Sequence, residues 1–343
     1  MRARLLALLL GWSLLAACRP VVSLPTGPSA APAGESVPSS AAPQPVVIAT
    51  AGFTAFNWAL YAAEAQGFFA EVGLQPDWLV TESPPKTAQA VISGDAQVGT
   101  IGTDFVIDAV ERGANLVIVG AEMRAPLMSL MVRPELRDWN DLRGKTLAVS
   151  GPQVAETLFT RKLLALHGLD PAAVDLVTVG SSTERYAALR SGAVTAAMLT
   201  QPFDLMIAGE GFRRLGDSTA VVTDYPFPTY TVRRDWATAH EGLLVRFLHA
   251  TRRGHQWLYE PANAAAAIAI LRERTRSEEA LARQTYQTLI EEKRLLTPDG
   301  AITTAGVANV IALMAEMGRL TPPLPAPEKF LALHYLEQAT ATP

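Results

Sequence analysis

The sequence predicts an α/β protein whose folded body consists of two similar lobes. Strand-like and helix-like stretches alternate along much of the chain, which is the pattern of α/β architecture. In addition, residues 90–105 and 188–203 share a pattern of Ser-Gly, small apolar residues and a closing Phe. Each copy predicts a helix end, a Gly turn, a short buried strand and a loop that opens the next helix. The alternative is two ordinary βα units without a common architecture.

Size and composition are consistent with two lobes. The chain has 343 residues, of which 49% are hydrophobic, and this supports a large core and roughly two domains. The formal net charge is -4, and no cluster of Arg and Lys is interleaved with aromatic residues. We therefore expect no nucleic-acid partner. Cys18 is the single cysteine, so no disulfide framework is expected and the core must hold the fold.

The N-terminal sequence predicts an export signal. Arg2 and Arg4 precede an apolar run at residues 5–15, which is too short to span a bilayer and predicts a signal peptide at residues 1–17. The sequence Leu-Ala-Ala-Cys that ends at Cys18 resembles the bacterial lipobox, which would make Cys18 the lipidated first residue of the mature protein. The alternative is a cysteine that follows an ordinary signal peptide by chance. Residues 18–45 contain seven prolines and predict an extended tether between membrane and body.

The body begins at residue 46 with elements of alternating type. Ser83 is expected to cap a helix whose first turn holds Pro84 and Pro85, where a missing N–H is harmless. Thr103 is the expected cap of a helix at residues 104–112. The other elements expected in this part are strands at residues 46–50, 77–80 and 116–119 and a helix at residues 58–66.

Two strand-like runs that end in Val-Arg, residues 127–132 and 229–233, enclose a segment of domain size. Within it, Ser181 and Glu184 form a capping-box pattern at the start of a helix. The segment also predicts strands at residues 146–149 and 175–179 and a helix at residues 151–167. After residue 235 the pattern is helical, with helices expected at residues 243–259, 262–272, 278–291, 303–317 and 329–338.

These elements predict a discontinuous division of the body. The first lobe would comprise residues 46–126 and 224–343, and the second lobe residues 127–223. Two crossing strands would then form a hinge that allows the lobes to close around a ligand.

Three motifs resemble a known family. Residues 62–69, Ala-Ala-Glu-Ala-Gln-Gly-Phe-Phe, with Gly-Leu soon after, resemble a signature of the nitrate, sulfonate and taurine group of bacterial ABC-importer substrate-binding proteins. Residues 93–99 resemble its S-G-x-A-D-x-G motif, although Gln97 stands where an acidic residue is usual. Residues 141–149 resemble its D-L-x-G-K-x-V-A-V motif. The same group includes binding proteins for thiamine-precursor pyrimidines and for riboflavin. The resemblance implies a type II periplasmic-binding-protein-like fold and an ABC permease as partner.

In open α/β sheets, ligands bind beyond the carboxyl ends of the strands. The resemblance places the ligand between the lobes, on loops that follow strands. Carried onto this chain, the expected ligand-binding residues are Phe53, Thr54, Phe56, Asn57, Trp58, Thr100, Thr103, Asp104, Gln153, Glu156, Gln201, Phe203, Asp204, Tyr225 and Phe227.

This set is rich in aromatic, amide and carboxylate groups and contains no Lys or Arg. A flat heteroaromatic ligand would stack on the aromatic rings, and its ring N–H groups would be donors for buried carboxylates. We therefore expect a vitamin-type ligand, with riboflavin first and a thiamine-precursor pyrimidine second. Helix N-termini leave a sulfonate or taurine-like anion as an alternative.

An enzyme is the competing class. The fungal pyrimidine synthase of thiamine biosynthesis resembles this fold and uses a His and a Lys, and the expected pocket loops contain neither. The chain also lacks a Gly-x-Ser-x-Gly motif, a phosphate loop and histidines at metal-ligand spacing. We expect a monomeric, exported binding protein that is not an enzyme and has no metal or cofactor. A tethered sensory module with the same pocket remains open.

Overall fold

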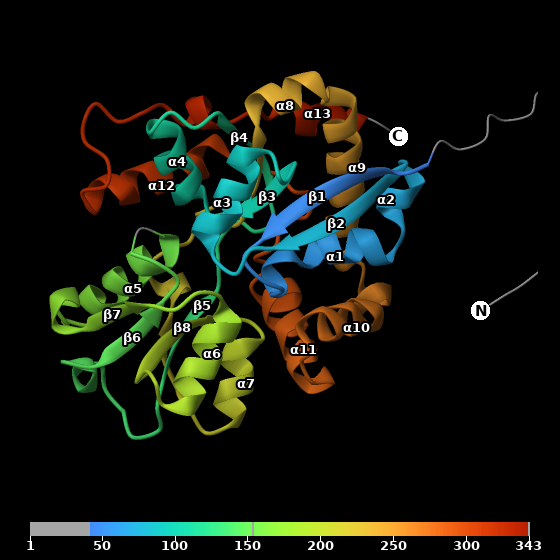
Figure 1. The fold of residues 1–343 in the computed structure, drawn as a ribbon. Helices are drawn as coiled ribbons and strands as arrows, with labels where there is room; N and C mark the ends of the chain where they lie inside the picture. Colours follow the sequence, from blue (N-terminus) through green and yellow to red (C-terminus); the bar gives the residue numbers. More distant parts are fainter. Residues whose placement is uncertain (1–41, 153, 342–343) are drawn as a thin grey trace, which may run out of the picture. The chain divides into compact units, whose positions relative to one another are not determined.

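The computed structural model describes residues 42–152 and 154–341, which contain two five-stranded mixed sheets (Figure 1). The order of the first sheet is β2-β1-β3-β10-β4, with β10 antiparallel to both of its neighbours. Its strands are β1 (Gln44–Thr50), β2 (Leu74–Val80), β3 (Val98–Ile101), β4 (Leu116–Ala121) and β10 (Thr229–Arg233). A strand from late in the chain therefore completes a sheet built from its beginning.

The order of the second sheet is β7-β6-β8-β5-β9, with β5 antiparallel to β8 and β9. Its strands are β5 (Met128–Val132), β6 (Thr146–Val149), β7 (Asp175–Thr178), β8 (Ala196–Thr200) and β9 (Arg213–Asp217). Strands β4 and β8 are buried along their whole length, as expected of apolar runs inside a covered sheet. The predicted α/β class with two sheet-containing parts is confirmed.

Each sheet contains one copy of the repeated pattern. In the first copy, α3 (Pro84–Ser93) ends at Gly94, which has φ 89°, and β3 follows. In the second copy, α6 (Ser182–Ser191) ends at Gly192, which has φ 84°, and β8 follows. Both glycines adopt the left-handed conformation that a side chain disfavours, so the shared Ser-Gly pair is a helix terminator that aims the chain into a buried strand.

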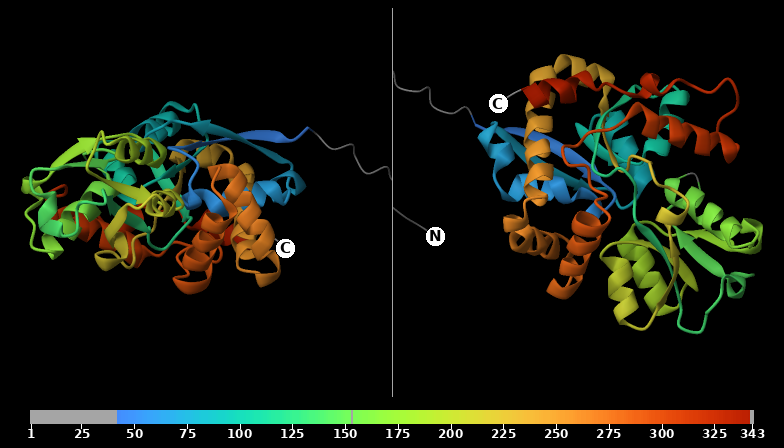
Figure 2. Two further views of the ribbon diagram at one scale, coloured as in Figure 1. Left: turned by 90° about the horizontal axis from the view of Figure 1, so that it is seen from below. Right: turned by 180° about the vertical axis from the view of Figure 1, so that it is seen from behind.

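Helices cover both sheets (Figures 1 and 2). Helices α1 (Trp58–Ala65) and α9 (Glu241–Leu258) lie side by side, and Phe247 of α9 stacks on Phe69 with ring centroids 5.4 Å apart. Burial of each such side chain stabilises the fold by about 1.5–3 kcal/mol. The other α-helices are α2 (Phe68–Glu71), α4 (Thr103–Glu111), α5 (Ala155–Leu166), α7 (Phe203–Gly209), α8 (Arg234–Ala239), α10 (Ala264–Thr275), α11 (Glu279–Tyr286), α12 (Thr304–Glu316) and α13 (His334–Ala341).

Two chain segments connect the sheets, at residues 122–127 and 218–228. The two segments lie side by side and are joined by backbone hydrogen bonds. The amide of Tyr225 donates to the carbonyl of Arg124 at 2.8 Å, and that of Phe227 donates to the carbonyl of Met123 at 2.9 Å. The paired crossing thus consists of the segments that directly precede β5 and β10, and neither segment is a strand, whereas two crossing strands were expected.

Several boundaries differ from the sequence prediction. Strand β9 was not predicted because its sequence, Arg-Arg-Leu-Gly-Asp, lacks an apolar run and lies at a sheet edge. Thr103 is the first residue of α4 rather than its cap, and α5 begins at Ala155 rather than near residue 151. The last helix begins at His334, five residues after the predicted start at 329.

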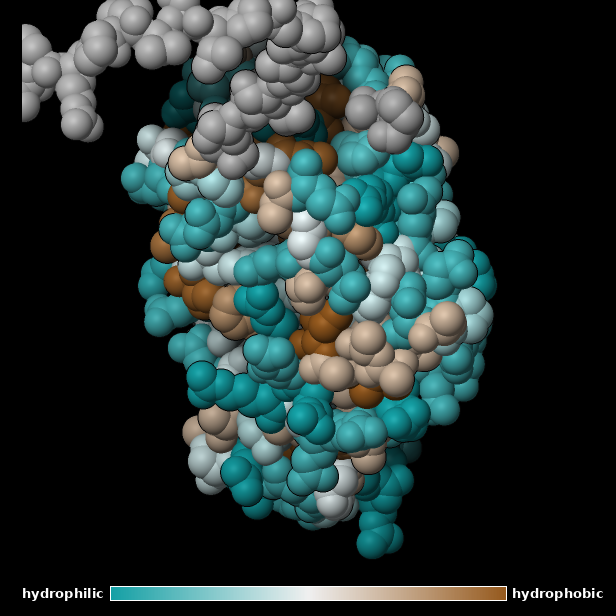
Figure 3. All heavy atoms as spheres, turned by 90° about the vertical axis from the view of Figure 1, so that its right-hand side faces the viewer, coloured by the Kyte–Doolittle hydropathy of each residue, from teal (hydrophilic) through white to brown (hydrophobic). Residues whose placement is uncertain are grey.

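The predicted signal peptide and the lipid attachment at Cys18 lie outside the described residues. No helix in the described part of the chain is long and apolar enough to cross a membrane. Figure 3 shows one face of the molecule, on which hydrophilic residues surround small, separate apolar areas.

Candidate ligand-binding cavity

A cavity lies at the carboxyl ends of strands from both sheets. Its empty space, including the part open to solvent, is about 780 Å³. The cavity is lined by Thr50, Ala51, Gly52, Thr54, Phe56, Asn57, Pro84, Thr100, Gly102, Asp104, Phe105, Met128, Ser150, Val154, Ala155, Glu156, Gly180, Ser181, Ser182, Thr183, Arg185, Thr200, Phe227 and Pro228.

The N-terminus of α6 reaches the cavity. Ser181 caps the helix: its hydroxyl accepts from the amide of Glu184 at 3.3 Å, and its own amide donates to the Glu184 carboxylate at 2.6 Å. The first intrahelical bond runs from the amide of Arg185 to the carbonyl of Ser181. The amides of Ser182 and Thr183 therefore have no acceptor within the helix, and both residues line the cavity. They form a donor pair at the positive end of a helix dipole.

Three buried polar atoms of lining residues lack a hydrogen-bond partner. They are Oγ1 of Thr200, Oδ1 of Asn57 and Oδ1 of Asp104. The amide of Thr200 donates to the hydroxyl of Ser182 at 3.0 Å, which places Thr200 beside the α6 N-terminus. Asn57 is held in place because its side-chain amide donates to Oγ1 of Thr50 at 2.9 Å. Unpartnered buried polar atoms are uncommon, and a bound ligand is one group that would satisfy them.

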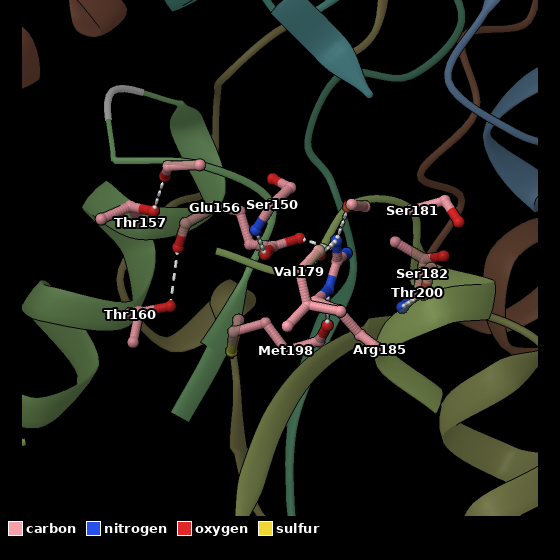
Figure 4. Close-up of polar contacts among 12 residues, drawn as sticks. Ser150, Glu156, Thr157, Thr160, Val179, Ser181, Ser182, Arg185, Met198 and Thr200 are labelled. Atoms are coloured by element: carbon pink, nitrogen blue, oxygen red, sulfur yellow. Dashed lines mark hydrogen bonds and ion pairs between the residues drawn. The ribbon is translucent and has the colours of Figure 1, made fainter. Parts of the chain in front are cut away.

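Arg185 and Glu156 form a buried ion pair at the edge of the cavity (Figure 4). Nη2 of Arg185 lies 2.6 Å from Oε2 of Glu156, and the two side chains are 3% and 4% exposed. Oε1 of Glu156 accepts from the amide of Ser150 at 2.7 Å. Burial raises the pKa of Glu156, and the neighbouring guanidinium opposes this rise.

The other two predicted carboxylates also have arginine partners. Asp104 lies 2.9 Å from Nη1 of Arg319, and Asp204 lies 2.7 Å from Nη2 of Arg214. Burial raises the pKa of both carboxyl groups, and in each case the arginine opposes the rise. The protein therefore supplies a cation to each buried carboxylate that the sequence suggested for a ligand N–H. Among the described residues, no three His, Cys, Asp or Glu side chains are arranged to hold a metal ion.

Comparison with known proteins places this fold and cavity in a family. Residues 57–265 match the family model described as NMT1/THI5 like, and this is more than half of the chain. The chain belongs to the NMT1/THI5-like family. The resemblance found in the sequence motifs is thereby confirmed.

The relatives of this NMT1/THI5-like protein include binding proteins. The taurine-binding periplasmic protein of Escherichia coli strain K12 is 26% identical over 215 residues, which cover 59% of this chain and 66% of that protein. The nitrate-binding protein NrtA of Synechocystis PCC 6803 has a TM-score of 0.76 at 13% identity, covering 87% of this chain and 89% of that chain. The alkanesulfonate-binding protein SsuA of Xanthomonas axonopodis pv. citri, solved with MOPS, has a TM-score of 0.69 at 18% identity, covering 84% and 98%. At these identities, the two solved structures show a common fold.

The structure brings half of the predicted site residues together at the cavity. Those that line it are Thr54, Phe56, Asn57, Thr100, Asp104, Glu156 and Phe227. Gln153 lies outside the described residues.

Three other predicted residues are packed in the protein rather than at the cavity. Trp58 is fully buried, and its Nε1 donates to the carbonyl of Ala267 at 3.1 Å. Phe203 packs in the apolar cluster of the second sheet. Phe53 packs edge-on against Tyr61 and Trp78.

The last four predicted residues also hold the structure rather than lining the cavity. The hydroxyl of Thr103 donates to the carbonyl of Pro226, and the carbonyl of Gln201 accepts from the amide of Ala55 at 3.2 Å. Asp204 is paired with Arg214 as described above. Tyr225 packs edge-on against Phe159, with ring centroids 4.9 Å apart.

Sequence reasoning missed Arg185, Thr200 and the first turn of α6. A signal for this turn existed in the capping box of Ser181 and Glu184, because it marks a helix N-terminus directly after strand β7. Nothing local indicated that Arg185 folds back toward the cavity rather than into solvent.

Proposed function

We propose that this protein is the extracytoplasmic binding component of an ABC importer and captures a small sulfonate-type anion that carries a hydrogen-bond donor at its other end. The observation that carries the proposal is the polarity of the cavity. Donors from the first turn of α6 and the hydroxyl of Thr200 lie together, and the unpartnered acceptor of Asn57 also lines the cavity.

The anionic group would bind at α6. Its first-turn amides at Ser182 and Thr183 point out of the helix, and a helix N-terminus with free amides favours a negative group. The hydroxyl of Thr200 is a further donor beside them. A sulfonate offers three acceptor oxygens and a single charge, which suits several donors that carry only partial charges.

The other end of the ligand would meet acceptors and apolar surface. Oδ1 of Asn57 has no partner in the protein and would accept a hydrogen bond from an ammonium or N–H group. The rings of Phe56 and Phe227 pack edge-on with centroids 5.4 Å apart and would cover an apolar body. A taurine-like aminosulfonate matches this arrangement.

Riboflavin is no longer the first choice. The argument for it rested on carboxylates in need of a ring N–H and on a large set of aromatic rings. The carboxylates have arginine partners, and Trp58, Phe203 and Tyr225 do not line the cavity. A thiamine-precursor pyrimidine is the second candidate because Phe56 and Phe227 could stack on its ring while Asn57 accepts from its amino group.

The relatives support a role in import. The proteins described above bind taurine, nitrate and alkanesulfonates according to their names. The lipid attachment at Cys18 belongs to the proposal, since it would hold the body at the outer side of the membrane beside a permease.

The test is calorimetry on the full chain produced with Cys18→Ser. Taurine and ethanesulfonate should bind, with taurine tighter, whereas riboflavin should give no saturable heat. Binding of an aminopyrimidine without any sulfonate would replace the proposal by its second candidate. Absence of heat with all sulfonates would overturn it.

A further inference from the structure

We propose that the ion pair of Glu156 and Arg185 is a charge filter, which keeps the anion-binding end of the cavity neutral so that singly charged anions are accepted and doubly charged ones are rejected. The inference rests on the proposed function and deepens it. It concerns the one arginine that lines the cavity in the described part of the chain.

Arg185 lies where an arginine could bind an anionic ligand, but its guanidinium nitrogens are hydrogen-bonded to the protein. Its Nε donates to the carbonyl of Met198 at 2.8 Å. Its Nη1 donates to the carbonyls of Val179, at 3.2 Å, and Gly180. Its Nη2 donates to Glu156. All three guanidinium nitrogens are thus bound to the protein, one to strand β8, one to the residues after β7 and one to α5, and Figure 4 shows the side chain among these partners.

Glu156 cancels the charge of this arginine. Both of its carboxylate oxygens accept from N–H donors, one from Arg185 and one from the amide of Ser150. Two donors and no acceptor face the carboxyl group in these bonds, an environment that favours the charged form. Burial raises the pKa of Glu156 and acts against this, but the two donors and the adjacent guanidinium favour an ionised pair, which carries no net charge at the cavity wall.

The donors left for a ligand are neutral groups. The amides of Ser182 and Thr183 and the hydroxyl of Thr200 contribute partial charges, and a helix N-terminus amounts to about half an elementary charge. A monoanion can be balanced by such donors. A second negative charge would be buried beside Glu156 without a cation of its own, which is costly. Arg185 is thus a positioning residue, and Glu156 sets the charge that the cavity accepts.

The experiment compares two ligands of similar size and different charge. These are 2-hydroxyethanesulfonate, with one negative charge, and sulfoacetate, with two. The wild-type cavity should prefer the first. Glu156→Gln removes one negative charge from the wall, so the affinity of sulfoacetate relative to 2-hydroxyethanesulfonate should rise by about tenfold. The ratio is taken within one variant, so the loss of one of the two acceptor oxygens affects both ligands alike.

Two further variants control the result. Glu82→Gln removes the same charge from a side chain that is 69% exposed, and its ratio should stay at the wild-type value because solvent screens that charge. The double variant Glu156→Gln with Arg185→Met has a neutral wall again and should return to the wild-type ratio. An unchanged ratio in Glu156→Gln would overturn the charge filter.

If Glu156→Gln does not fold, Arg185→Met carries the test. At alkaline pH, where the unpaired Glu156 is ionised, this variant leaves a negative charge in the cavity wall, so sulfoacetate should lose about tenfold more affinity than 2-hydroxyethanesulfonate. An unchanged ratio there also overturns the inference.

A separate measurement distinguishes failure of the proposed function from failure of the charge filter. If the wild type binds no sulfonate, inorganic sulfate is used as the probe. The melting temperature in sulfate is then compared with the melting temperature in sodium chloride at equal ionic strength. A larger sulfate shift in Glu156→Gln than in the wild type would still support the filter, and equal shifts would refute it.

Discussion

The hydroxyl of Tyr230 lies 2.8 Å from Nε2 of His255 and also bonds to the carboxyl group of Glu122. All three side chains are essentially inaccessible to solvent. Nδ1 of His255 lies 2.7 Å from the carbonyl oxygen of Thr297, which can only accept, so Nδ1 carries the ring proton. In the neutral ring Nε2 must then accept from Tyr230, and Tyr230 in turn requires a proton from Glu122. Every hydrogen bond in this chain of side chains has one donor and one acceptor when Glu122 is a neutral acid.

The pKa directions agree with this proton count. Burial raises the pKa of Glu122 to about 8 and lowers that of His255 to about 4. Glu122 stabilises the fold at low pH, and this contribution is lost as pH rises from the unfolded value of about 4.3 to about 8. His255 contributes stability that is present above about 6.5 and is lost as pH falls toward about 4. The two effects oppose each other between about pH 4.5 and 6.5.

The contribution of Glu122 and His255 to the free energy of unfolding should therefore be nearly constant between about pH 5 and 6.5 and should fall between about pH 6.5 and 8, by about 1.4 kcal/mol per pH unit. Glu122→Gln imitates the neutral acid, because its amide can donate to Tyr230 and its carbonyl can accept from the amide of Ala59. This variant should lose the fall at alkaline pH. Denaturant titrations from pH 5 to 9 measure it, and parallel curves for both proteins would contradict the assignment.

Gly254→Ala should destabilise the protein by about 1–3 kcal/mol through overpacking. A Cβ atom at this position of α9 would lie 2.2 Å from the carbonyl oxygen of Ala59 and 2.9 Å from the Cβ of Ala63, both on α1. Gly242→Ala is the matched control on the same helix, since no atom lies within 4 Å of its added Cβ. The control should be neutral or stabilising by up to about 1 kcal/mol. Equal effects of the two substitutions in thermal unfolding would argue against the close approach of α1 and α9.

Thr200→Val should weaken binding of a sulfonate by about tenfold or more, because a hydrogen bond to a charged group is worth about 1.5–3 kcal/mol. Stability should change little, since the hydroxyl of Thr200 has no partner in the protein. Calorimetry and thermal unfolding of the same variant separate the two effects. Thr195→Val, at a residue outside the cavity lining, serves as control and should bind normally.

Trp58→Ala should act on stability rather than on binding. The indole is fully buried, and its ring lies edge-on to Tyr286 with centroids 5.9 Å apart. Loss of a buried aromatic side chain costs about 3–5 kcal/mol. The variant should unfold at lower denaturant concentration while the fraction that remains folded keeps its affinity. A selective loss of affinity at unchanged stability would return Trp58 to the binding site.

Local elements were predictable from the sequence. Strands β6 and β10 were placed at their observed bounds, since each is a short apolar or β-branched run between turn residues. The Gly turns after α3 and α6 and the capping box of Ser181 were also correct. These features depend on backbone conformation and on neighbours within a few residues, and the sequence states both directly.

The partners of the buried charges were not predictable. Asp104 and Arg319 lie 215 positions apart, and Glu156 and Arg185 lie 29 apart. The sequence by itself determined the α/β class, the repeated βα unit and the family, because these follow from periodicity, turns and motifs. The tertiary structure alone decided which carboxylates are already neutralised, which aromatic rings lie in the core and which helix N-terminus meets the cavity. Burial and ion pairing depend on segments that are distant in the chain, and only packing brings them within a few ångströms.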